Sequence, residues 1–293
     1  MKLYIPYKIK FLFLHLFRKI IIEKNLSKIY KDRFGVDLNI NNPTTFSEKL
    51  FARMILVNKR GNAAFTRLAD KFLVRDYVKQ KVGEQYLVPL LWFGTNPTQI
   101  PFSTLPDKCV IKTNHGSASN IIKNGVIDEE KVIANLKRWL KEDYFVFAYE
   151  YHYSNIPRKV LVEQFLDDGS GNGPLDYRFW CFNGEPVFIQ VDNFKHDINP
   201  FYDQNWNQLE VSSRVNFNKV NIPKPDNLEE MINVAKKLSA DFNFVRVDLY
   251  NIKGQIYFGE MTFTPGSGRF QFSPESINQK LGELWSFDGI INI

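Results

Sequence analysis

The stretch VRVDLYNIKGQIYFGEMTFTPG, residues 245–266, carries the pattern that decides the fold. Apolar and polar residues alternate on both sides of a Lys-Gly pair at 253–254, which predicts a β-hairpin with its turn at that pair. Successive side chains of a strand point to opposite faces. Arg246 and Asp248 therefore share the face opposite the apolar residues of the first strand.

The returning strand of the hairpin adds Glu260 and Thr262, which share one face. Asp248 and Glu260 meet only if the turn has an odd length or a β-bulge shifts the register, because a plain two-residue turn puts them on opposite faces. Where they meet, two carboxylates and a hydroxyl suit a hard cation, and Arg246 beside them suits phosphate oxygens. Taken alone, the pattern is also that of a surface hairpin with an Arg–Asp ion pair.

Two loops of small residues are candidates for binding an anion. The first, 113–119 (TNHGSAS), follows Lys112 at the end of a predicted strand, an arrangement that can hold nucleotide phosphates. The pattern G-x-x-x-x-G-K-[ST] is absent, so this is not a P-loop. The second loop, 264–268 (TPGSG), lets backbone N–H groups approach an anion. A simple turn is the alternative for each.

Two further strand ends carry charged residues. Glu163 lies near the end of an apolar strand predicted at 160–166, where its carboxylate and the neighbouring backbone can meet an adenine amino group. Asp176 and Arg178 are two residues apart on the next strand and share a face. In each case the alternative is a solvated strand end.

The rest of the chain alternates between helical and extended patterns. Thr45 and Glu48 have the spacing of a capping box, and Asn183-Gly184 predicts a hairpin turn. We expect helices at 46–56, 70–81, 128–149 and 226–240, and strands at 86–92, 109–112, 120–123, 160–166, 177–182, 186–191, 245–252 and 255–262. Such a mixture of helices and hairpins indicates an α+β or mixed α/β fold.

Composition places the chain among folded globular proteins. Its 293 residues allow one large domain or two intimate lobes, and 44% hydrophobic and 24% charged residues are ordinary values. They exclude a disordered chain, a collagen-like repeat and a coiled-coil rod. Two cysteines, Cys109 and Cys181, lie in apolar runs and make neither a disulfide framework nor a zinc site.

Positive charge is concentrated at the N-terminus. The chain has 38 basic and 32 acidic residues, and residues 1–31 hold eight of the basic ones against the single acid Glu23. The remainder is nearly neutral, which argues against a nucleic-acid partner. The longest uncharged run of the arm, 11–17, is far shorter than the ~20 residues of a membrane span. The arm predicts a helix that either packs on the body or lies on an anionic membrane surface.

The order of the candidate residues is more informative than any one of them. The stretches around Asp248 and Glu260 resemble those of D-alanine–D-alanine ligases, in which Asn usually stands where this chain has Thr262. The candidates follow one another as in an ATP-grasp enzyme: Lys112, Glu163, Asp176, Arg178, Arg246, Asp248, Glu260, Thr262 and Gly266.

Seven stretches resemble the teichuronopeptide-biosynthesis (TupA-like) ATP-grasp family, and the resemblance runs from about residue 28 to the end. The chain departs from the family pattern at Arg178, where many members have Lys, and at Ala118-Ser119, which replace glycines. The seven stretches are TFSEKL (45–50), DK (70–71), KTNHG (112–116), DYRF (176–179), CFNG (181–184), FYD (201–203) and EMTFTPGSG (260–268).

The resemblance implies an ATP-grasp fold, in which two α+β lobes hold ATP between them. We expect a basic helical arm at 1–35, helices and the first lobe at 36–165, and the second lobe with the metal and substrate site at 166–293. The implied activity uses ATP and Mg²⁺ to join a carboxylate to an amine through an acylphosphate. The implied partners are an amino acid and an acidic sugar or polysaccharide intermediate of the bacterial cell envelope.

The resemblance also assigns roles to residues. Lys112 holds phosphates, and Arg246 steadies the phosphoryl group in transfer. The other assignments are His115, Gly116, Ser117, Glu163, Gln164, Leu166, Asp176 and Arg178 for the nucleotide, Asp248, Glu260 and Thr262 for magnesium, and Lys195, His196, Gly266 and Ser267 for the substrate.

Two functions of other classes compete with ligation. A sugar-transfer enzyme of the same pathway is disfavoured, because the sequence has no D-x-D motif suited to a nucleotide sugar. A non-catalytic scaffold at the membrane is disfavoured by the intact set of Arg246, Asp248 and Glu260. We expect a cytoplasmic protein, peripheral on the inner membrane if the arm binds lipid.

Overall fold

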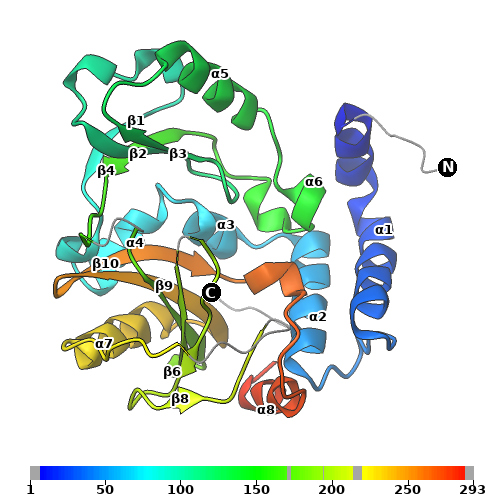
Figure 1. The fold of residues 1–293 in the computed structure, drawn as a ribbon. Coiled ribbons are helices and arrows are strands. Elements are labelled where there is room, and N and C mark those ends of the chain that lie inside the picture. The colour runs from blue at the N-terminus through cyan, green and yellow to red at the C-terminus, as the bar shows by residue number, and fades with distance from the viewer. Residues whose placement is uncertain (1–6, 170–172, 194, 214–219, 288–293) are drawn as a thin grey trace.

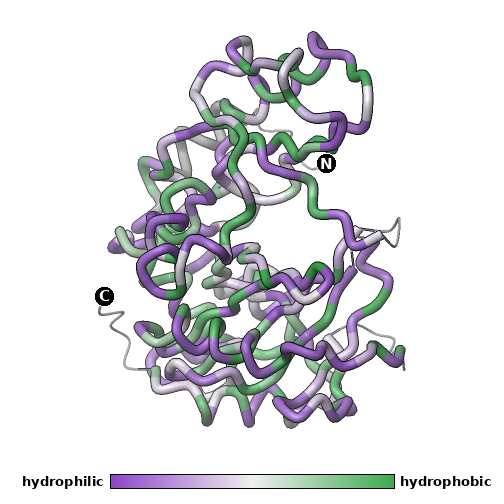
Figure 2. Tube along the Cα trace, turned by 90° about the vertical axis from the view of Figure 1, so that its left-hand side faces the viewer, coloured by the Kyte–Doolittle hydropathy of each residue, from purple (hydrophilic) through white to green (hydrophobic). Residues whose placement is uncertain are grey.

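The computed structural model describes residues 7–169, 173–193, 195–213 and 220–287. Two antiparallel sheets with helices around them confirm the α+β class (Figure 1). The smaller sheet has the strand order β1-β4-β2-β3, and the larger one β10-β9-β5-β6-β7-β8. In the side view of Figure 2, the lobe of the smaller sheet lies at one end of the molecule.

The sequence order of the elements separates the two sheets. The small sheet consists of β1 (Leu90–Gly94), β2 (Lys108–Thr113), β3 (Asn120–Asn124) and β4 (Val160–Gln164). The large sheet consists of β5 (Asp176–Phe182), β6 (Glu185–Asp192), β7 (Phe201–Tyr202), β8 (Gln208–Leu209), β9 (Phe244–Ile252) and β10 (Gln255–Thr262). The helices are α1 (Tyr7–Phe34), α2 (Phe46–Arg60), α3 (Ala63–Ala69), α4 (Val74–Lys81), α5 (Glu129–Trp139), α6 (Phe145–Ala148), α7 (Leu228–Ser239) and α8 (Ser276–Leu284). The chain-order boundaries of the three expected domains remain a prediction.

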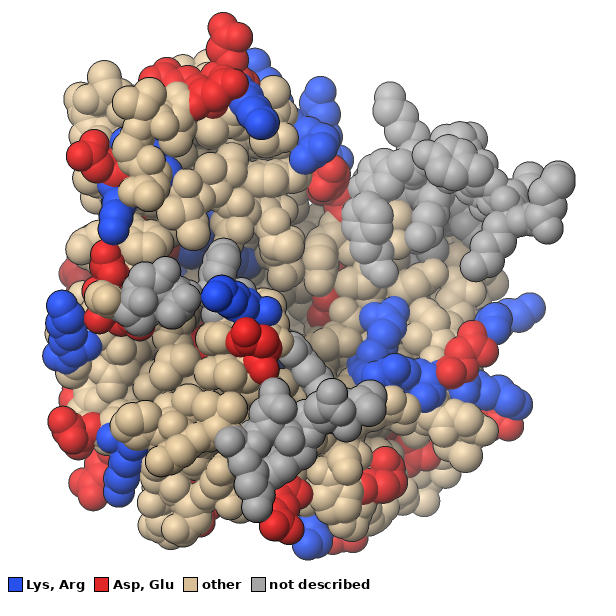
Figure 3. Space-filling view, in the orientation of Figure 1, with Lys and Arg blue, Asp and Glu red and all other residues tan. Residues whose placement is uncertain are grey.

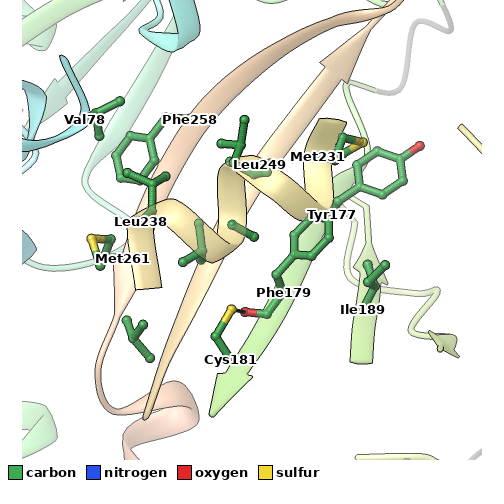
Figure 4. Packing of buried hydrophobic residues seen from close by; sticks show 14 of the residues in the cluster. Val78, Tyr177, Phe179, Cys181, Ile189, Met231, Leu238, Leu249, Phe258 and Met261 are labelled. Carbon is green, nitrogen blue, oxygen red and sulfur yellow. Dashed lines mark hydrogen bonds between the residues drawn. The ribbon is translucent and has the colours of Figure 1, made fainter. Parts of the chain in front are cut away.

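Each sheet buries one face against a helix. In the small sheet, Ile111 and Val162 pack in one cluster with Leu136 of α5. In the large sheet, Val247 and its apolar neighbours pack against α7, where Leu238 lies near Phe258 at one end of the helix and Met231 near Tyr177 at the other (Figure 4). Because strand side chains alternate, the opposite face of the large sheet carries the charged residues at one end. At its other end the same face packs Trp180, Phe182 and Phe244 against Phe46 of α2 in a second buried cluster.

Helix α1 packs on α2 through its C-terminal half. Ile22 and Leu26 are fully buried in a cluster with Phe51 of α2. On the outer side, Leu16 and Ile20 are 67% and 76% exposed. Packing on the body is therefore found for this half, while membrane contact of the exposed side remains a prediction. Residues 1–6 of the expected arm lie outside the described residues.

No helix in the described part of the chain combines the length and the apolar character that crossing a membrane requires. Over most of the face drawn in Figure 3, basic and acidic side chains are intermixed.

The first two helical segments differ from the prediction at their boundaries. The capping box of Thr45 and Glu48 is present and starts α2 as expected, but the helix continues to Arg60, beyond the predicted end at 56. The helix expected at 70–81 begins only at α4, and the preceding α3 was not predicted. The reason is Asp70, whose carboxylate accepts the backbone N–H groups of Phe72 and Leu73 at 2.8 and 3.3 Å and so closes a turn before the helix.

Two other predicted elements are shorter than expected. The helix at 128–149 is split, because Asp143 accepts the backbone N–H of Phe145 at 3.0 Å and restarts the chain as α6. The strand at 86–92 begins only at β1, since Pro89 has no N–H to give to a neighbouring strand.

Candidate functional site

A β-bulge at Gly259 brings Asp248 and Glu260 together. In β10, Phe258 pairs with Leu249 and Glu260 pairs with Asp248, so that Gly259 is the extra residue. This is one of the two register changes that the sequence required for a shared face. A Cβ on Gly259 would lie 3.0 Å from the backbone oxygen of Asp248, so the close approach of the two strands leaves little room for a side chain here.

Arg246 bridges the two carboxylates. Its Nε and Nη2 donate to Oδ1 and Oδ2 of Asp248 at 2.7 and 2.5 Å. The same Nη2 lies 3.4 Å from Oε1 of Glu260 and 3.1 Å from Oγ1 of Thr262. The Thr262 hydroxyl in turn donates to Glu260 at 2.8 Å. Oxygen atoms of three side chains thus converge on one positively charged nitrogen.

This convergence fits a magnesium ion. Mg²⁺ in nucleotide sites is bound by one or two carboxylates, and phosphate and water complete its coordination. In the described ranges, no group of three or more His, Cys, Asp or Glu residues could hold a metal, so the chain offers only part of a coordination shell. Burial opposes ionisation of Glu260, yet Lys71 and Arg246, with the Thr262 hydroxyl, lower its pKa on balance and keep it an anion.

Arg178 is the centre of a second charged cluster on the same face. Its Nε and Nη1 contact Asp176 and Asp192 at 2.8 and 2.5 Å, and Nε lies 3.9 Å from Oδ2 of Asp248. Asp192 also contacts Nδ1 of His196 at 2.9 Å. Asp176 and Arg178 therefore share a face as expected, and they adjoin the carboxylates of the hairpin.

Lys112 and Glu163 form an ion pair on the polar face of the small sheet. Nζ of Lys112 lies 2.5 Å from Oε2 of Glu163, and Nη1 of Arg75 lies 3.5 Å from Oε1. Both paired side chains are largely shielded from solvent, with 21% and 9% of their area exposed. The two residues expected at opposite ends of a nucleotide are thus in contact, and Glu163 is held by two basic groups.

Lys71 is a basic residue to which the sequence assigned no role. Its Nζ donates to the carbonyl oxygen of Gly116 at 2.8 Å. Burial lowers the pKa of Lys71, and the carboxylates of Glu260 and Glu163 act in the opposite direction. Because these two acids belong to different sheets, Lys71 lies between the two polar faces. Its only signal in the sequence was membership of the stretch DK at 70–71.

The loop after Lys112 is anchored at its first half. Asn114 is fully buried and donates to Asp70 at 2.8 Å. His115 is also buried, with Nε2 3.2 Å from the carbonyl oxygen of Glu142, and burial lowers the pKa of His115 to about 4. The imidazole is therefore neutral and faces the chain between α5 and α6. Only the backbone of this half, and the exposed Ser117, remain for a nucleotide.

The other expected residues are more dispersed. Gln164 and Lys195 are exposed, and Leu166 is half-buried just after β4. Gly266 and Ser267 lie in a short turn after β10, with left-handed φ values of 58° and 49°. The structure brings neither Gln164 nor Lys195 into the charged clusters, and the roles of all these residues remain predictions.

Glu150 is a buried acid that sequence reasoning missed. It is 5% exposed and accepts hydrogen bonds from Oγ1 of Thr264 and, at 3.3 Å, from Oγ of Ser267. Burial raises the pKa of Glu150 to about 7, and the charge of Glu260 adds to this rise. No local pattern could reveal the contact, because Glu150 and Thr264 are 114 residues apart in sequence.

A family model described as TupA-like ATPgrasp matches residues 48–286 of this chain. A search among curated proteins found no match.

Among solved structures, D-alanine–D-alanine ligase from Bacillus anthracis complexed with ATP is 16% identical with a TM-score of 0.41, over 71% of this chain and 55% of that one. The D-alanine–D-alanine ligase from Helicobacter pylori is 18% identical with a TM-score of 0.46, over 81% and 69% of the two chains. An L-amino acid ligase from Bacillus licheniformis is 14% identical with a TM-score of 0.46, over 83% and 55%. The alignments thus span little more than half to two thirds of these proteins.

Proposed function

Because this chain belongs to the TupA-like ATP-grasp family, we propose that it is an ATP-dependent ligase that joins a carboxylate to an amine through an acylphosphate. The products of the reaction are an amide, ADP and phosphate. The partners are an amino acid and a sugar acid or peptide part of a cell-surface polysaccharide. The observation that carries this proposal is the convergence of Asp248, Glu260 and Thr262 on the guanidinium of Arg246.

ATP binds between the polar faces of the two sheets. Lys112 and Lys71 contact its phosphates, and the backbone of Gly116 and Ser117 closes on them. Glu163 and the backbone that follows it receive the adenine. In this account Lys112 exchanges its ion pair with Glu163 for contacts with the nucleotide, so both charges keep a partner when ATP arrives.

The hairpin β9–β10 supplies the charges for phosphoryl transfer. Asp248, Glu260 and Thr262 would hold magnesium, which when bound neutralises negative charge on the phosphates. Arg246 stabilises the charge of the phosphoryl group in transfer, and the chain contributes positioning and electrostatics rather than covalent help.

The two chemical steps follow from this arrangement. An oxygen of the substrate carboxylate attacks the γ-phosphorus, and ADP leaves. The amine then attacks the acyl carbon, the C–N bond forms, and phosphate leaves with the electrons of the broken C–O bond. The backbone N–H of Gly266 faces the acyl oxygen, whereas that of Ser267 donates to the carbonyl oxygen of Thr264 at 2.9 Å and positions the turn.

We also propose a cytoplasmic location, with the protein peripheral on the inner membrane. The support is the row of basic residues on the N-terminal arm together with the exposed Leu16 and Ile20. Aliphatic side chains on a basic helix can enter the boundary of an anionic bilayer.

The test is ATP consumption by the full chain, screened over amino acids combined with uronic acids, with the product identified by mass spectrometry. We expect ADP, phosphate and an amide for at least one pair. Release of AMP and pyrophosphate would rule out the acylphosphate route. If ATP binds but is consumed with none of the pairs of amino acid and uronic acid, the scaffold function is favoured.

A further inference from the structure

Glu150 differs from the other buried carboxylates in its partners. Its only hydrogen-bond donors in the described part of the chain are the hydroxyls of Thr264 and Ser267. Asp70, by contrast, accepts three N–H groups. The remaining buried acids each have a Lys or Arg nitrogen within 4.0 Å, and they are Asp143, Glu163, Asp192 and Asp248.

In the described ranges no Lys or Arg nitrogen lies within 4.0 Å of Glu150, and burial outweighs the lowering of its pKa by the more distant Arg269. A buried carboxylate without a close counter-charge is costly, since desolvation penalises its charged form. Glu150 accordingly offers an unused partner for a positive group from outside the chain. The raised pKa, about 7, still leaves much of Glu150 ionised at neutral pH.

Arg269 is the opposite case: a basic residue without a close acid. Its Nη1 lies 3.4 Å from the carbonyl oxygen of Ser267, and within the described ranges no Asp or Glu oxygen lies within 4.0 Å of its guanidinium. Glu150, which can bind a cation, and Arg269, which can bind an anion, therefore both contact Ser267 but do not pair with each other.

This set adjoins the residues that we assign to the nucleotide. Tyr144 is a neighbour of Glu150, and a Cβ built on Gly116 would lie 3.1 Å from Tyr144. Thr264 and Ser267 directly follow β10, which carries Glu260. The titratable and charged groups that act on Glu150 and its neighbours are Tyr144, Tyr153, Glu260 and Arg269.

We propose that Glu150, Ser267 and Arg269 form the binding site for the amine partner, and that this partner is a free amino acid in its zwitterionic form. Its ammonium group contacts Glu150 and its carboxylate contacts Arg269, because these opposite charges both contact Ser267. The assignment of this molecule as the nucleophile rests on the proposed ligase function. The binding itself follows from two opposite charges that act on each other through space but form no ion pair within 4.0 Å in the described ranges.

In the reaction, the ammonium group gives one proton to the Glu150 carboxylate. The freed electron pair of the nitrogen then attacks the acyl carbon, and the C–O bond to phosphate breaks. The second proton lost from nitrogen goes to the departing phosphate. The carboxylate on Arg269 stays unreacted, so the product keeps a free acid group.

The test measures binding rather than turnover. The twenty common amino acids are titrated singly, at millimolar concentrations, into the full chain by calorimetry, with and without ADP and Mg²⁺. The same titrations use Glu150→Gln, Arg269→Gln and the control Arg138→Gln, an exposed arginine on α5. For each amino acid that binds, its amide and its deaminated acid are titrated as well.

We expect at least one amino acid to bind, and each site variant to weaken it roughly tenfold or more, with the control unchanged. The amide, which lacks the ligand carboxylate, should bind the wild type more weakly than the amino acid does, but should bind Arg269→Gln about as well as the amino acid does. The deaminated acid, which lacks the ammonium group, should bind Glu150→Gln about as well as the amino acid does. Failure of every amino acid to bind the wild type overturns the inference. So does binding that neither variant weakens.

The outcomes also separate this inference from the proposed function. If amino acid binding depends on Glu150 and Arg269 but no ATP-dependent ligation occurs, the ligase function fails and the site stands. If ligation occurs and both variants bind the amino acid as the wild type does, the function stands and the site is elsewhere.

Discussion

Asp248 and Glu260 are direct cross-strand partners, and the bulged Gly259 makes them so. Without this extra residue, strand alternation would place the two carboxylates on opposite faces of the sheet. One residue in β10 therefore decides whether the hairpin presents a cation site or an ordinary surface.

Replacing Gly259 by Ala should distort this pairing. The added Cβ would lie 3.0 Å from the backbone oxygen of Asp248 and 3.2 Å from the ring of Tyr250, so the strand backbone and the ring must shift by a few tenths of an ångström. We expect a loss of about 1–3 kcal/mol in the free energy of unfolding, typical of overpacked sites, with weakened Mg²⁺-dependent nucleotide binding. Denaturant unfolding and calorimetry measure the two effects, and unchanged values for both would contradict the close approach.

Replacing Lys112 by Met should weaken nucleotide binding by about tenfold or more, because a charge-assisted contact to phosphate is lost. Glu163 keeps Arg75 as a partner, so the fold should survive. The measurement is the Kd of an ATP analogue.

The matched control for this change is Lys108→Met. Lys108 lies on the same face of β2, but it is exposed and pairs with Asp167 at 3.1 Å. We expect its Kd to remain near the wild-type value. Equal losses in the two variants would show that general charge, and not the position of Lys112, attracts the nucleotide.

Replacing Glu150 by Gln should change how stability depends on pH. The pKa of Glu150 is raised from 4.5 to about 7 by burial, so between these values the folded chain holds a proton that the unfolded chain has released. Stability on account of this group therefore falls as pH rises through that window. Relative to the wild type, Glu150→Gln should gain up to about 3 kcal/mol between pH 4 and pH 8. Thermal unfolding at both pH values tests this. A variant whose stability relative to the wild type is no higher at pH 8 than at pH 4 would contradict the raised pKa of Glu150.

Replacing Leu16 and Ile20 together by Ser should reduce binding to vesicles that contain anionic lipid. These side chains are exposed on α1, so the variant should unfold at the wild-type temperature. Sedimentation with vesicles measures the binding. Equal sedimentation of variant and wild type would leave α1 with only its packing role.

The packing role of α1 has its own test in Leu26→Ala. Leu26 is fully buried against α2. We expect this variant to lose about 2–5 kcal/mol of stability, as buried leucines do when truncated. A near-neutral effect would mean that the contact of α1 with α2 contributes little to the fold.

Local patterns in the sequence predicted most of the elements that carry the site. The hairpin of β9 and β10, its turn and the shared face of Asp176 and Arg178 all follow from alternation and turn residues. The split of the helix expected at 128–149 did not, because it depends on Asp143, whose carboxylate also meets His15 of α1 and Ser154.

The sequence could not predict the contacts between the two sheets either, because they also join residues that are far apart in the chain. Lys71 lies near Glu163 and Glu260 only because the two lobes fold over it. The neutral, buried state of His115 likewise results from tertiary packing. A loop of small polar residues gives no local sign that one of its members turns inward.

We propose that Asp248 and Glu260 hold magnesium for a bound nucleotide. The most direct measurement is calorimetric titration of a non-hydrolysable ATP analogue, with and without Mg²⁺, into the wild type, Asp248→Asn, Glu260→Gln and the control Asp203→Asn. We expect Mg²⁺ to tighten binding to the wild type and to the control. In each of the two hairpin variants, we expect the Kd measured with Mg²⁺ to be about tenfold or more above that of the wild type. Mg²⁺ tightening that persists in both hairpin variants would contradict this proposal.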